Sequence, residues 1–257
     1  MDTVERDPFS LRDKTFLITG GTRGIGRGIS LRFAKAGARV IAVYLRNEMT
    51  ADQLKKIAIE DGLKIELCRA DLTTDGGLEK LNGFLTESCP ELSGLIHCAA
   101  TGIHRRIEDL TERHFDWTFN LNVRVFFKLV KSLLGRLHEG SSILAVSSWG
   151  ATRAMPNYSL VGSSKGALES LARHLAMELA PRGIHVNILT AGAVLTDAWK
   201  SIPDSEKRIA EMTQRTPAGR LVSVEDVASA AQFLCSDAAA GIVGQTLVVD
   251  GGIGIVI

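Results

Sequence analysis

The stretch Thr15-Phe16-Leu17-Ile18-Thr19-Gly20-Gly21-Thr22-Arg23-Gly24-Ile25-Gly26 joins a short apolar run directly to a glycine-rich loop. The apolar run predicts a first strand over 15–19, and the segment after the loop predicts a helix through Ala36. Glycines at this junction permit a tight turn and a close approach of backbone to a pyrophosphate at the helix N-terminus. A glycine pattern alone is a weak signal, but its place after a first strand predicts dinucleotide binding.

Outward from this unit, apolar β-branched runs alternate with longer amphipathic stretches, which is typical of βαβ units. The further strands are expected over 39–44, 64–69, 95–98, 142–147, 183–189 and 245–249, and the further helices over 51–61, 78–88, 111–137 and 166–179. We therefore expect an α/β fold: a single-domain Rossmann fold with a seven-stranded, mostly parallel sheet and helices on both faces.

The Rossmann-fold domain is expected to span residues 11–257, after an N-terminal extension over 1–10. Residues 195–221 form a long excursion between the sixth and seventh strands. Long excursions in compact domains are usually lids or binding loops, so we predict a substrate lid there. The alternative is a plain pair of surface helices.

Composition excludes several classes of protein. The chain has 257 residues, 45% of them hydrophobic, and a net charge of +1, which disfavours disorder and a nucleic-acid-binding surface. No apolar run is long enough to span a membrane, and the acidic N-terminus lacks the apolar centre of a signal peptide. The four cysteines are scattered without a Cys-x2-Cys pair, which argues against a zinc site and a disulfide framework. We expect a cytoplasmic protein with reduced thiols, no metal, and no nucleic-acid or membrane partner.

The end of the second strand bears on the choice of cofactor. An NAD-type site has an Asp or Glu there for the ribose hydroxyls, but the sequence 43–47 has no carboxylate before Glu48. Arg23 and Arg46 are instead candidate cations for a 2′-phosphate, so the sequence predicts NADPH. Asp71, after the third strand, is placed either to meet the adenine edge or to cap a turn.

A phenol precedes a lysine by seven residues in the segment 156–165, which opens the helix continuing over 166–179. Tyr158 is one of only two tyrosines, and seven residues are close to two helical turns, roughly 10 Å along the axis. A cation at Lys165 would favour the phenolate of Tyr158. The alternative is a half-buried tyrosine and an exposed lysine with no chemical role.

Together these features resemble the short-chain dehydrogenase/reductase family, from about residue 10 onward. The residues that carry the resemblance are Thr19–Gly26, Asp71, Asn122, Ser148, Lys165, Asn187, Thr196-Asp197 and Val249-Asp250-Gly251-Gly252. The chain departs from the usual pattern in three places. Val161 stands four residues before the lysine where most members have tyrosine, His97-Cys98-Ala99-Ala100 replaces Asn-Asn-Ala-Gly, and Ala191-Gly192 replaces Pro-Gly.

The Tyr-x6-Lys spacing resembles the enoyl-(acyl carrier protein) reductase branch. With the undiverged glycine loop and the segment 117–122, the chain is most similar to the NADPH-dependent type III enoyl reductases of bacterial fatty-acid biosynthesis. The resemblance implies a trans-2-enoyl thioester substrate on acyl carrier protein or coenzyme A, and a homotetramer. The apolar C-terminal segment 252–257 is a candidate subunit interface.

The resemblance also implies site residues. Tyr158 would hydrogen-bond the enolate oxygen and Lys165 the nicotinamide ribose hydroxyls. Ser148 would support the phenol or the thioester oxygen, unless it is a strand-end turn serine, and Asn122 would shape its helix and a water chain. The predicted cofactor-binding residues are Gly20, Thr22, Arg23, Gly24, Ile25, Gly26, Tyr44, Arg46, Asp71, Leu72, Cys98, Ala99, Ala100, Lys165, Gly192, Val194 and Thr196.

The substrate is expected to be a long apolar acyl chain. Its predicted contacts are Tyr158 and six residues that could equally be ordinary core: Trp149, Met155, Leu195, Ala198, Trp199 and Ile202. Lys200, Lys207 and Arg208 are candidates for a basic patch facing an acidic carrier protein, or simply a solvated helix face. His97 and Cys98 are poor candidates for a nucleophile.

The displaced tyrosine fits the chemistry of an enoyl thioester. Ketone reduction places hydride on the carbonyl carbon, whereas enoyl reduction places it on Cβ while charge builds on an oxygen two carbons away. Moving the phenol from position 161 to 158 shifts its anchor by about 4.5 Å along a helix. Two alternatives stay open: a carbonyl or 3-ketoacyl reductase of the same fold, and a non-catalytic dinucleotide-binding protein.

Overall fold

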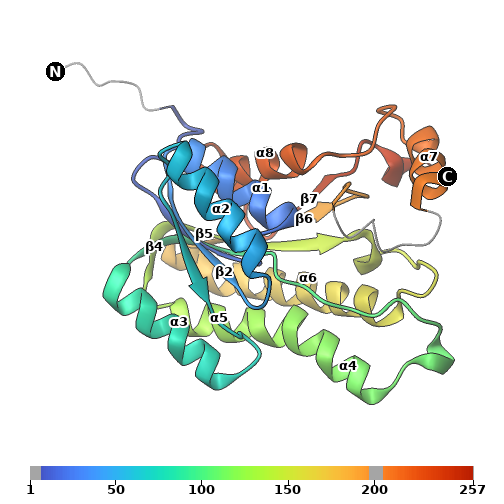
Figure 1. The fold of residues 1–257 in the computed structure, drawn as a ribbon, viewed down its shortest axis with the longest axis horizontal. Coiled ribbons are helices and arrows are strands. Elements are labelled where there is room, and N and C mark those ends of the chain that lie inside the picture. Colours follow the sequence, from blue (N-terminus) through green and yellow to red (C-terminus); the bar gives the residue numbers. More distant parts are fainter. Residues whose placement is uncertain (1–6, 197–204, 257) are drawn as a thin grey trace.

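A seven-stranded sheet forms the centre of the computed structural model, which describes residues 7–196 and 205–256 (Figure 1). The strand order is β3-β2-β1-β4-β5-β6-β7, and every neighbouring pair in it is parallel. The strands are β1 (Thr15–Thr19), β2 (Arg39–Tyr44), β3 (Ile65–Arg69), β4 (Leu92–His97), β5 (Leu137–Ser148), β6 (His185–Ala191) and β7 (Thr246–Val249). The predicted fold class is confirmed.

Helices cover both faces of the sheet (Figure 1). One face is covered by α1 (Gly24–Lys35), α2 (Glu48–Glu60) and α8 (Val224–Leu234). The other is covered by α3 (Asp75–Ser88), α5 (Val125–Leu133) and α6 (Ser159–Leu179), with α4 (Glu112–Phe119) leading into α5. α7 (Ser205–Arg215) lies at the end of the molecule where the C-terminus is found, and it is the helix within the described residues of the 195–221 excursion.

The alternation of side chains along β1 explains why a separate core forms on each face. Phe16 and Ile18 belong to the core beneath α1 and α8, whereas Leu17 belongs to the core beneath α3, α5 and α6. All three side chains are fully buried. A strand buried on both faces favours apolar residues at successive positions, so the three central residues of β1 are all apolar.

Two helices begin three residues before the predicted positions because polar side chains cap them. The side chain of Asn47 accepts a hydrogen bond from the Thr50 N–H, and α2 starts at Glu48. Thr74 accepts from the Gly77 N–H in the same way, and α3 starts at Asp75. Such caps satisfy backbone donors that the first helical turn leaves unpaired.

The predicted continuous helix over 111–137 is wrong at its middle and its end. α4 stops at Phe119, a π-helical turn spans Asn120–Arg124, and α5 ends at Leu133. Leu137 is already a strand residue, paired with Leu92 of β4 and buried. Pairing and burial at the sheet therefore override the apolar periodicity that carries the helix prediction past its true end.

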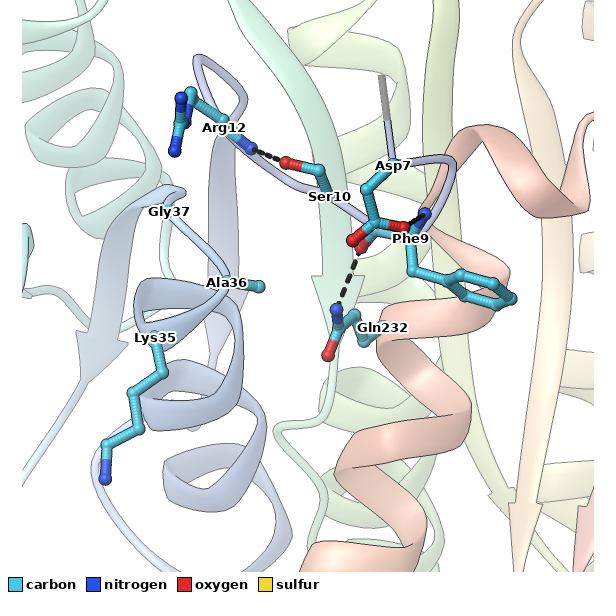
Figure 2. Close-up of a pocket in the computed structure, with 8 residues that line it drawn as sticks. All are labelled: Asp7, Phe9, Ser10, Arg12, Lys35, Ala36, Gly37 and Gln232. Carbon is cyan, nitrogen blue, oxygen red and sulfur yellow. Dashed lines mark hydrogen bonds between the residues drawn. The ribbon is translucent and has the colours of Figure 1, made fainter. Parts of the chain in front are cut away.

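Residues 7–13 pack over the amino-terminal edge of the sheet (Figure 2). The Phe9 ring lies 6.3 Å from that of Phe233, and the Gln232 side chain donates to the Phe9 carbonyl at 2.8 Å. The pocket in Figure 2 lies between this segment, the end of α1 and α8. Because its lining residues Arg12 and Gly37 precede β1 and β2, this pocket lies at the end of the strands opposite to the glycine loop.

None of the helices within 7–196 and 205–256 is both long and apolar enough to cross a membrane. The same residues contain no group of three or more His, Cys, Asp or Glu side chains that could hold a metal ion.

The contact between α1 and α8 predicts opposite effects for two helical glycines. A Cβ at Gly28 of α1 would lie 2.1 Å from Cγ1 of Val224, whereas a Cβ at Gly83 of α3 would meet nothing within 4 Å. Gly83→Ala should raise the free energy of unfolding by about 0.5–1 kcal/mol, the usual helical preference for alanine. Gly28→Ala should lower it by about 1–3 kcal/mol through overpacking.

Urea unfolding of both variants measures this difference. Because both glycines lie inside helices, the propensity gain is shared, and only the Val224 contact separates them. Equal stabilisation by the two substitutions would contradict the tight α1–α8 contact.

Candidate active site

The carboxyl ends of β1, β4, β5 and β6 bring together most of the residues predicted from the sequence. Strands β2 and β3 lie on one side of β1, and β4 to β7 lie on the other. In open parallel sheets, ligands bind outside the carboxyl ends of the strands where the order reverses in this way. The candidate site therefore lies in the crevice between the glycine loop and the start of α6.

The glycine loop leaves room for a ligand at the N-terminus of α1. Gly20 has a φ of 65°, and a Cβ there would come within 3.1 Å of the Ala99 backbone. A Cβ at Gly26 would lie 2.2 Å from the Gly20 carbonyl oxygen. Arg23 precedes α1 without a side-chain cap, and the first turn carries no acidic residue. Thr22 is buried, and Ile25 packs against the core. This arrangement suits an anionic group such as a pyrophosphate.

The hydroxyl of Thr19 ties the end of β1 to the end of β4. Its Oγ1 accepts from the backbone N–H groups of Cys98 at 3.2 Å and Ala99 at 3.0 Å, and it lies 3.2 Å from His97 Nδ1. Ala100 follows as an exposed residue. Thr19 thus holds the backbone of the predicted cofactor residues 98 and 99 beside the glycine loop.

Neither residue at the end of β4 has the ionisation expected of a nucleophile or base. Burial, with the charge of Lys165 nearby, lowers the pKa of His97 to about 3, and burial raises the pKa of the Cys98 thiol to about 11. His97 is therefore neutral and Cys98 a thiol at neutral pH. This agrees with the prediction that they are poor candidates for a nucleophile.

The end of β2 carries cations rather than a carboxylate that is open to a ligand. Tyr44 ends β2 opposite Arg69 of β3, and Arg69 pairs with Glu48, the first acid after the strand. Arg46 is exposed. Of the ion pairs among the described residues, none involves Arg23 or Arg46. Both arginines can therefore meet an anionic ligand.

Asp71 caps its own turn. Its Oδ1 accepts from the Thr73 N–H at 3.0 Å and the Thr73 hydroxyl at 2.6 Å. The next side chain, Leu72, is buried in the core. The turn-capping alternative considered for Asp71 is therefore what the structure shows.

Tyr158 lies immediately before α6, at its N-cap position, rather than inside the helix. Its Oη lies 3.3 Å from Ser148 Oγ, and either hydroxyl can donate. Gly150 makes room for the phenol, because a Cβ there would lie 2.4 Å from the Tyr158 ring. On the other side, the His104 ring centroid is 5.1 Å away. The structure thus brings Ser148 and Tyr158 together and adds His104, which the sequence analysis missed.

A closely packed valine, Val161, stands at the position where most family members have tyrosine. Val161 is buried in α6, and a Cβ at Gly102 would come within 2.1 Å of its Cγ2. The loop after β4 therefore lies directly against Val161, where a phenol would not fit without moving that loop. The only described tyrosine beside Ser148 is Tyr158.

Lys165 is buried at the centre of the site. Its Nζ donates to the Val146 carbonyl of β5 at 2.7 Å, and burial lowers its pKa to about 8. The alternative considered above, an exposed lysine at position 165, is therefore wrong. A buried ammonium beside a crevice is suited to binding polar ligand groups.

Asn122 is a fully buried positioning residue. It lies in the π-helical turn, where its Oδ1 accepts from the Thr101 N–H and its Nδ2 donates to the Thr101 carbonyl and to Ser164 Oγ, all at 2.9 Å. It therefore joins the loop after β4 to α6. This is consistent with its predicted role in shaping the helix, and π-turns of this kind are frequent at functional sites.

Glu169, one turn after Lys165, is a buried residue that the sequence analysis missed. Its Oε1 accepts from Ser147 at 2.6 Å and from Thr190 at 3.3 Å, so it links β5 and β6 beneath the site. Its Oε2 is 3.9 Å from the Arg173 guanidinium. A burial signal was visible in its helical spacing from the apolar Ala172 and Ala176, but its hydroxyl partners come from distant strands.

The residues that follow β6, Val194 to Thr196, lie beside the glycine loop. A Cβ at Gly24 would meet the Thr196 side chain at 3.7 Å, which places Thr196 over the glycine loop. Val194 is buried and bridges to Val222, whereas Leu195 is exposed. Met155 lines a cavity together with Tyr158 and Gly150. The predicted contacts Ala198, Trp199, Lys200 and Ile202 lie outside the described residues, as does the side chain of Arg208, while Lys207 is exposed on α7.

Comparison with known proteins places this geometry in a family. A family model described as Enoyl-(Acyl carrier protein) reductase matches residues 20–254. The chain is 34% identical to 1-cyclohexenylcarbonyl-CoA reductase of Streptomyces collinus, over 100% of this chain and 92% of the relative. It is 31% identical to enoyl-(acyl-carrier-protein) reductase (NADH) of Escherichia coli strain K12, over 95% of each.

Relatives of another activity match equally well. The chain is 34% identical to 7α-hydroxysteroid dehydrogenase of Escherichia coli strain K12, over 96% of each. A solved structure of a 7α-hydroxysteroid dehydrogenase with NADH and 7-oxo glycochenodeoxycholic acid superposes with a TM-score of 0.88 at 33% identity, over 95% of this chain and 96% of that one. The matches span both chains almost completely: the chain belongs to the short-chain dehydrogenase/reductase family of oxidoreductases.

Proposed function

We propose that this protein is an NADPH-dependent enoyl thioester reductase that acts on acyl carrier protein or coenzyme A substrates in fatty-acid or related acyl-chain biosynthesis. The observation that carries the proposal is the position of the phenol. Tyr158 reaches Ser148 from the residue before α6, while Val161 fills the usual family position against Gly102. Two of the relatives above are named as reductases of enoyl thioesters.

A nicotinamide dinucleotide fits the crevice, because side chains are missing where its pyrophosphate would lie, at Gly20 and Gly26. When bound, the dinucleotide supplies hydride. Arg23 and Arg46 are the candidate cations for a 2′-phosphate, and Glu48 is engaged by Arg69. These features support NADPH, although one enoyl reductase relative is named for NADH.

The chain's own contribution is the placement of hydrogen-bond donors. In enoyl reduction, negative charge builds on the thioester oxygen, and a donor fixed beside that oxygen stabilises the transition state. The Tyr158 hydroxyl is held by Ser148, and its ring is held between Gly150 and His104. Lys165 is placed deeper, where its ammonium can bind the ribose hydroxyls. Trp149, Met155 and Leu195 are the described candidates for acyl contacts.

A carbonyl reductase is the second candidate, and one observation favours it. The Tyr158–Ser148 pair can also bind a ketone oxygen, and the hydroxysteroid dehydrogenase relatives act on such a group. The two candidates differ in the carbon that receives hydride and in the product, which is a saturated thioester in one case and an alcohol in the other.

We further propose a homotetramer in the cytosol. Exposed aromatic side chains on α4 and α5 support subunit contacts there, with Phe115, Trp117 and Phe127 each about half exposed. The four cysteines are all free, as expected for reduced thiols.

Replacing the phenol tests the proposed reaction. We expect wild type to oxidise NADPH with a medium-chain trans-2-enoyl thioester and not with the matching 3-ketoacyl thioester. Tyr158→Phe should lower kcat/KM for the enoyl substrate by roughly a hundredfold to a thousandfold, the usual effect of removing one such donor. Turnover of the keto substrate alone would favour the carbonyl reductase.

The buried lysine predicts a pH dependence of cofactor binding. Lys165 is positively charged below its pKa of about 8 and neutral above it, so NADPH affinity should fall as pH rises through 8. Its neighbours His97 and Cys98 have pKa values of about 3 and 11, and they do not titrate in this range. Titration by NADPH fluorescence measures the effect, which Lys165→Met should abolish and Lys128→Met should leave unchanged. The same pH dependence in Lys165→Met would contradict the assignment.

The two arginines predict the choice of cofactor. Arg46→Ala and Arg23→Ala should each weaken NADPH binding by roughly tenfold to a hundredfold, because a hydrogen bond to a charged group contributes about 1.5–3 kcal/mol. Affinity for NADH should be unchanged, and so should both affinities in the exposed control Arg113→Ala. Equal losses for the two cofactors would show that the arginines do not contact a 2′-phosphate.

A further inference from the structure

Glu169, in the middle of α6, is a buried carboxylate for which the proposed reaction gives no role. The residue is only 5% exposed, and its Oε1 accepts from Ser147 Oγ of β5 at 2.6 Å and from Thr190 Oγ1 of β6 at 3.3 Å. Glutamate is rarely buried to this degree without a cation near it, because removing a carboxylate from water is costly. The burial of Glu169 therefore implies a nearby cation.

Two cations of α6 stand four residues from Glu169, Arg173 after it and Lys165 before it. The Arg173 guanidinium is 3.9 Å from Glu169 Oε2, but its side chain is 53% exposed. An ion pair with one partner in water contributes little, because water screens it. Lys165 is buried, so its charge is not screened in this way. A buried carboxylate therefore has its larger effect on Lys165.

Lys165 and Glu169 are directed to the same place on the sheet. Residues four apart on a helix share a face, with Cβ atoms about 5–6 Å apart, and side chains lean toward the helix N-terminus, which takes Glu169 toward Lys165. The two side chains end at consecutive residues of β5. Lys165 Nζ donates to the Val146 carbonyl at 2.7 Å, and Glu169 accepts from Ser147, the next residue. Neighbouring groups of one strand thus hold the ammonium and the carboxylate close together.

Two opposing influences act on the protonation of Lys165. Burial lowers its pKa to about 8, while Cys98 and Glu169 act in the opposite direction. Cys98 carries no charge at that pH, because burial raises the pKa of its thiol to about 11. Glu169 is therefore the charged group that favours the ammonium form of Lys165.

The other titratable groups around α6 are neutral, exposed or distant. His97 of β4 is neutral, because burial lowers its pKa to about 3. On β5 and β6, His138, Glu139 and His185 lie at the amino-terminal ends of the strands, away from the site. The ionisable side chains of the glycine loop, α4, the π-helical turn, and the segment from the turn after β5 to the start of α6 are exposed or half-buried: Arg23, Glu112, Arg113, His114, Asp116, Arg124, Arg153 and Tyr158.

We propose that Glu169 is a positioning residue whose buried carboxylate keeps Lys165 in its ammonium form, and so sets the pH range over which the dinucleotide binds. The inference rests on the part of the proposed function in which Lys165 binds the ribose hydroxyls of the cofactor. Ser147 and Thr190 hold the carboxylate in place. Without the negative charge of Glu169, Lys165 loses its proton at a lower pH.

Glu169→Gln tests this role, because the glutamine amide oxygen can still accept from both hydroxyls while the charge is lost. The midpoint of the fall in NADPH affinity should move from about pH 8 to roughly pH 7, since a nearby opposite charge shifts a pKa by about one unit or more. Relative to wild type at the same pH, which removes the effect of the cofactor's own ionisation, the Kd should be roughly fivefold higher at pH 8 and unchanged at about pH 6. A loosened fold would weaken binding at both pH values.

Two further variants and a direct titration complete the test. Glu178→Gln, the same change at an exposed position of α6, should leave the midpoint unchanged. In a Lys165→Met background, Glu169→Gln should no longer alter the Kd, because the carboxylate acts through the ammonium. NMR of the cofactor-free protein with isotope-labelled lysine should show the Lys165 resonance titrating about one pH unit lower in Glu169→Gln. The loss of that resonance in Lys165→Met assigns it.

The outcomes distinguish this role from the proposed function. If wild-type affinity does not change around pH 8, Lys165 does not bind the cofactor as proposed, and the effect of Glu169 on binding is wrong with it. If wild-type affinity falls there but Glu169→Gln moves neither midpoint, the role of Glu169 alone is wrong. Equal weakening at both pH values with an unmoved resonance would show that Glu169 only stabilises the fold. Shifted midpoints in a protein that reduces no enoyl thioester would contradict the proposed reaction and support the role of Glu169.

Discussion

The site depends on a direct backbone contact between the turn after β5 and the start of α6. Gly150 and Gly162 make this contact, since a Cβ at Gly162 would lie 2.7 Å from the Gly150 carbonyl oxygen. The phenol of Tyr158 fills the space that Gly150 leaves, and its hydroxyl reaches Ser148. Larger residues at either glycine would push the turn off the helix and separate the two hydroxyls. The distance between phenol and serine is therefore set by backbone packing.

Burial determines the charges beneath this contact. Burial lowers the pKa of Lys165 to about 8, because its ammonium is removed from water. Burial also makes His97 and Cys98 neutral at neutral pH, with pKa values of about 3 and 11. Glu169 is a buried carboxylate that two hydroxyls and an arginine satisfy. In such an interior an unpaired polar group is costly, so the hydrogen bonds of Lys165 and Glu169 are a condition for burying both side chains.

Much of the fold could be predicted from the sequence because each βαβ unit is a local pattern. The strand β1 and the glycine loop were predicted at their observed positions, and β2 was predicted with its observed bounds. Helix starts were less accurate, since the caps at Asn47 and Thr74 lie before the apolar periodicity begins. Leu137 was assigned to the wrong element because its partner, Leu92, is distant in sequence.

The site was predictable only where a spacing encodes it. Tyr158, Lys165 and Ser148 stand at fixed separations along the chain, and the structure joins Tyr158 to Ser148 and buries Lys165 in the helix that Tyr158 precedes. His104, Glu169 and Asp250 have no such spacing to their partners. Asp250 meets Trp149 across 101 residues, and Glu169 meets Ser147 across 22. Contacts of this kind arise from the strand order of the sheet, which no local pattern specifies.

The central claim is that hydride reaches Cβ of an enoyl thioester, and isotope labelling tests it most directly. Wild-type enzyme would be given NADPH deuterated at the transferred position, with equal amounts of a trans-2-enoyl and a 3-ketoacyl thioester, and the products analysed by mass spectrometry and NMR. The account predicts one deuterium at Cβ of the saturated thioester and none in a hydroxyacyl product. Deuterium on the carbinol carbon of a 3-hydroxyacyl thioester, with the enoyl substrate left intact, would contradict it.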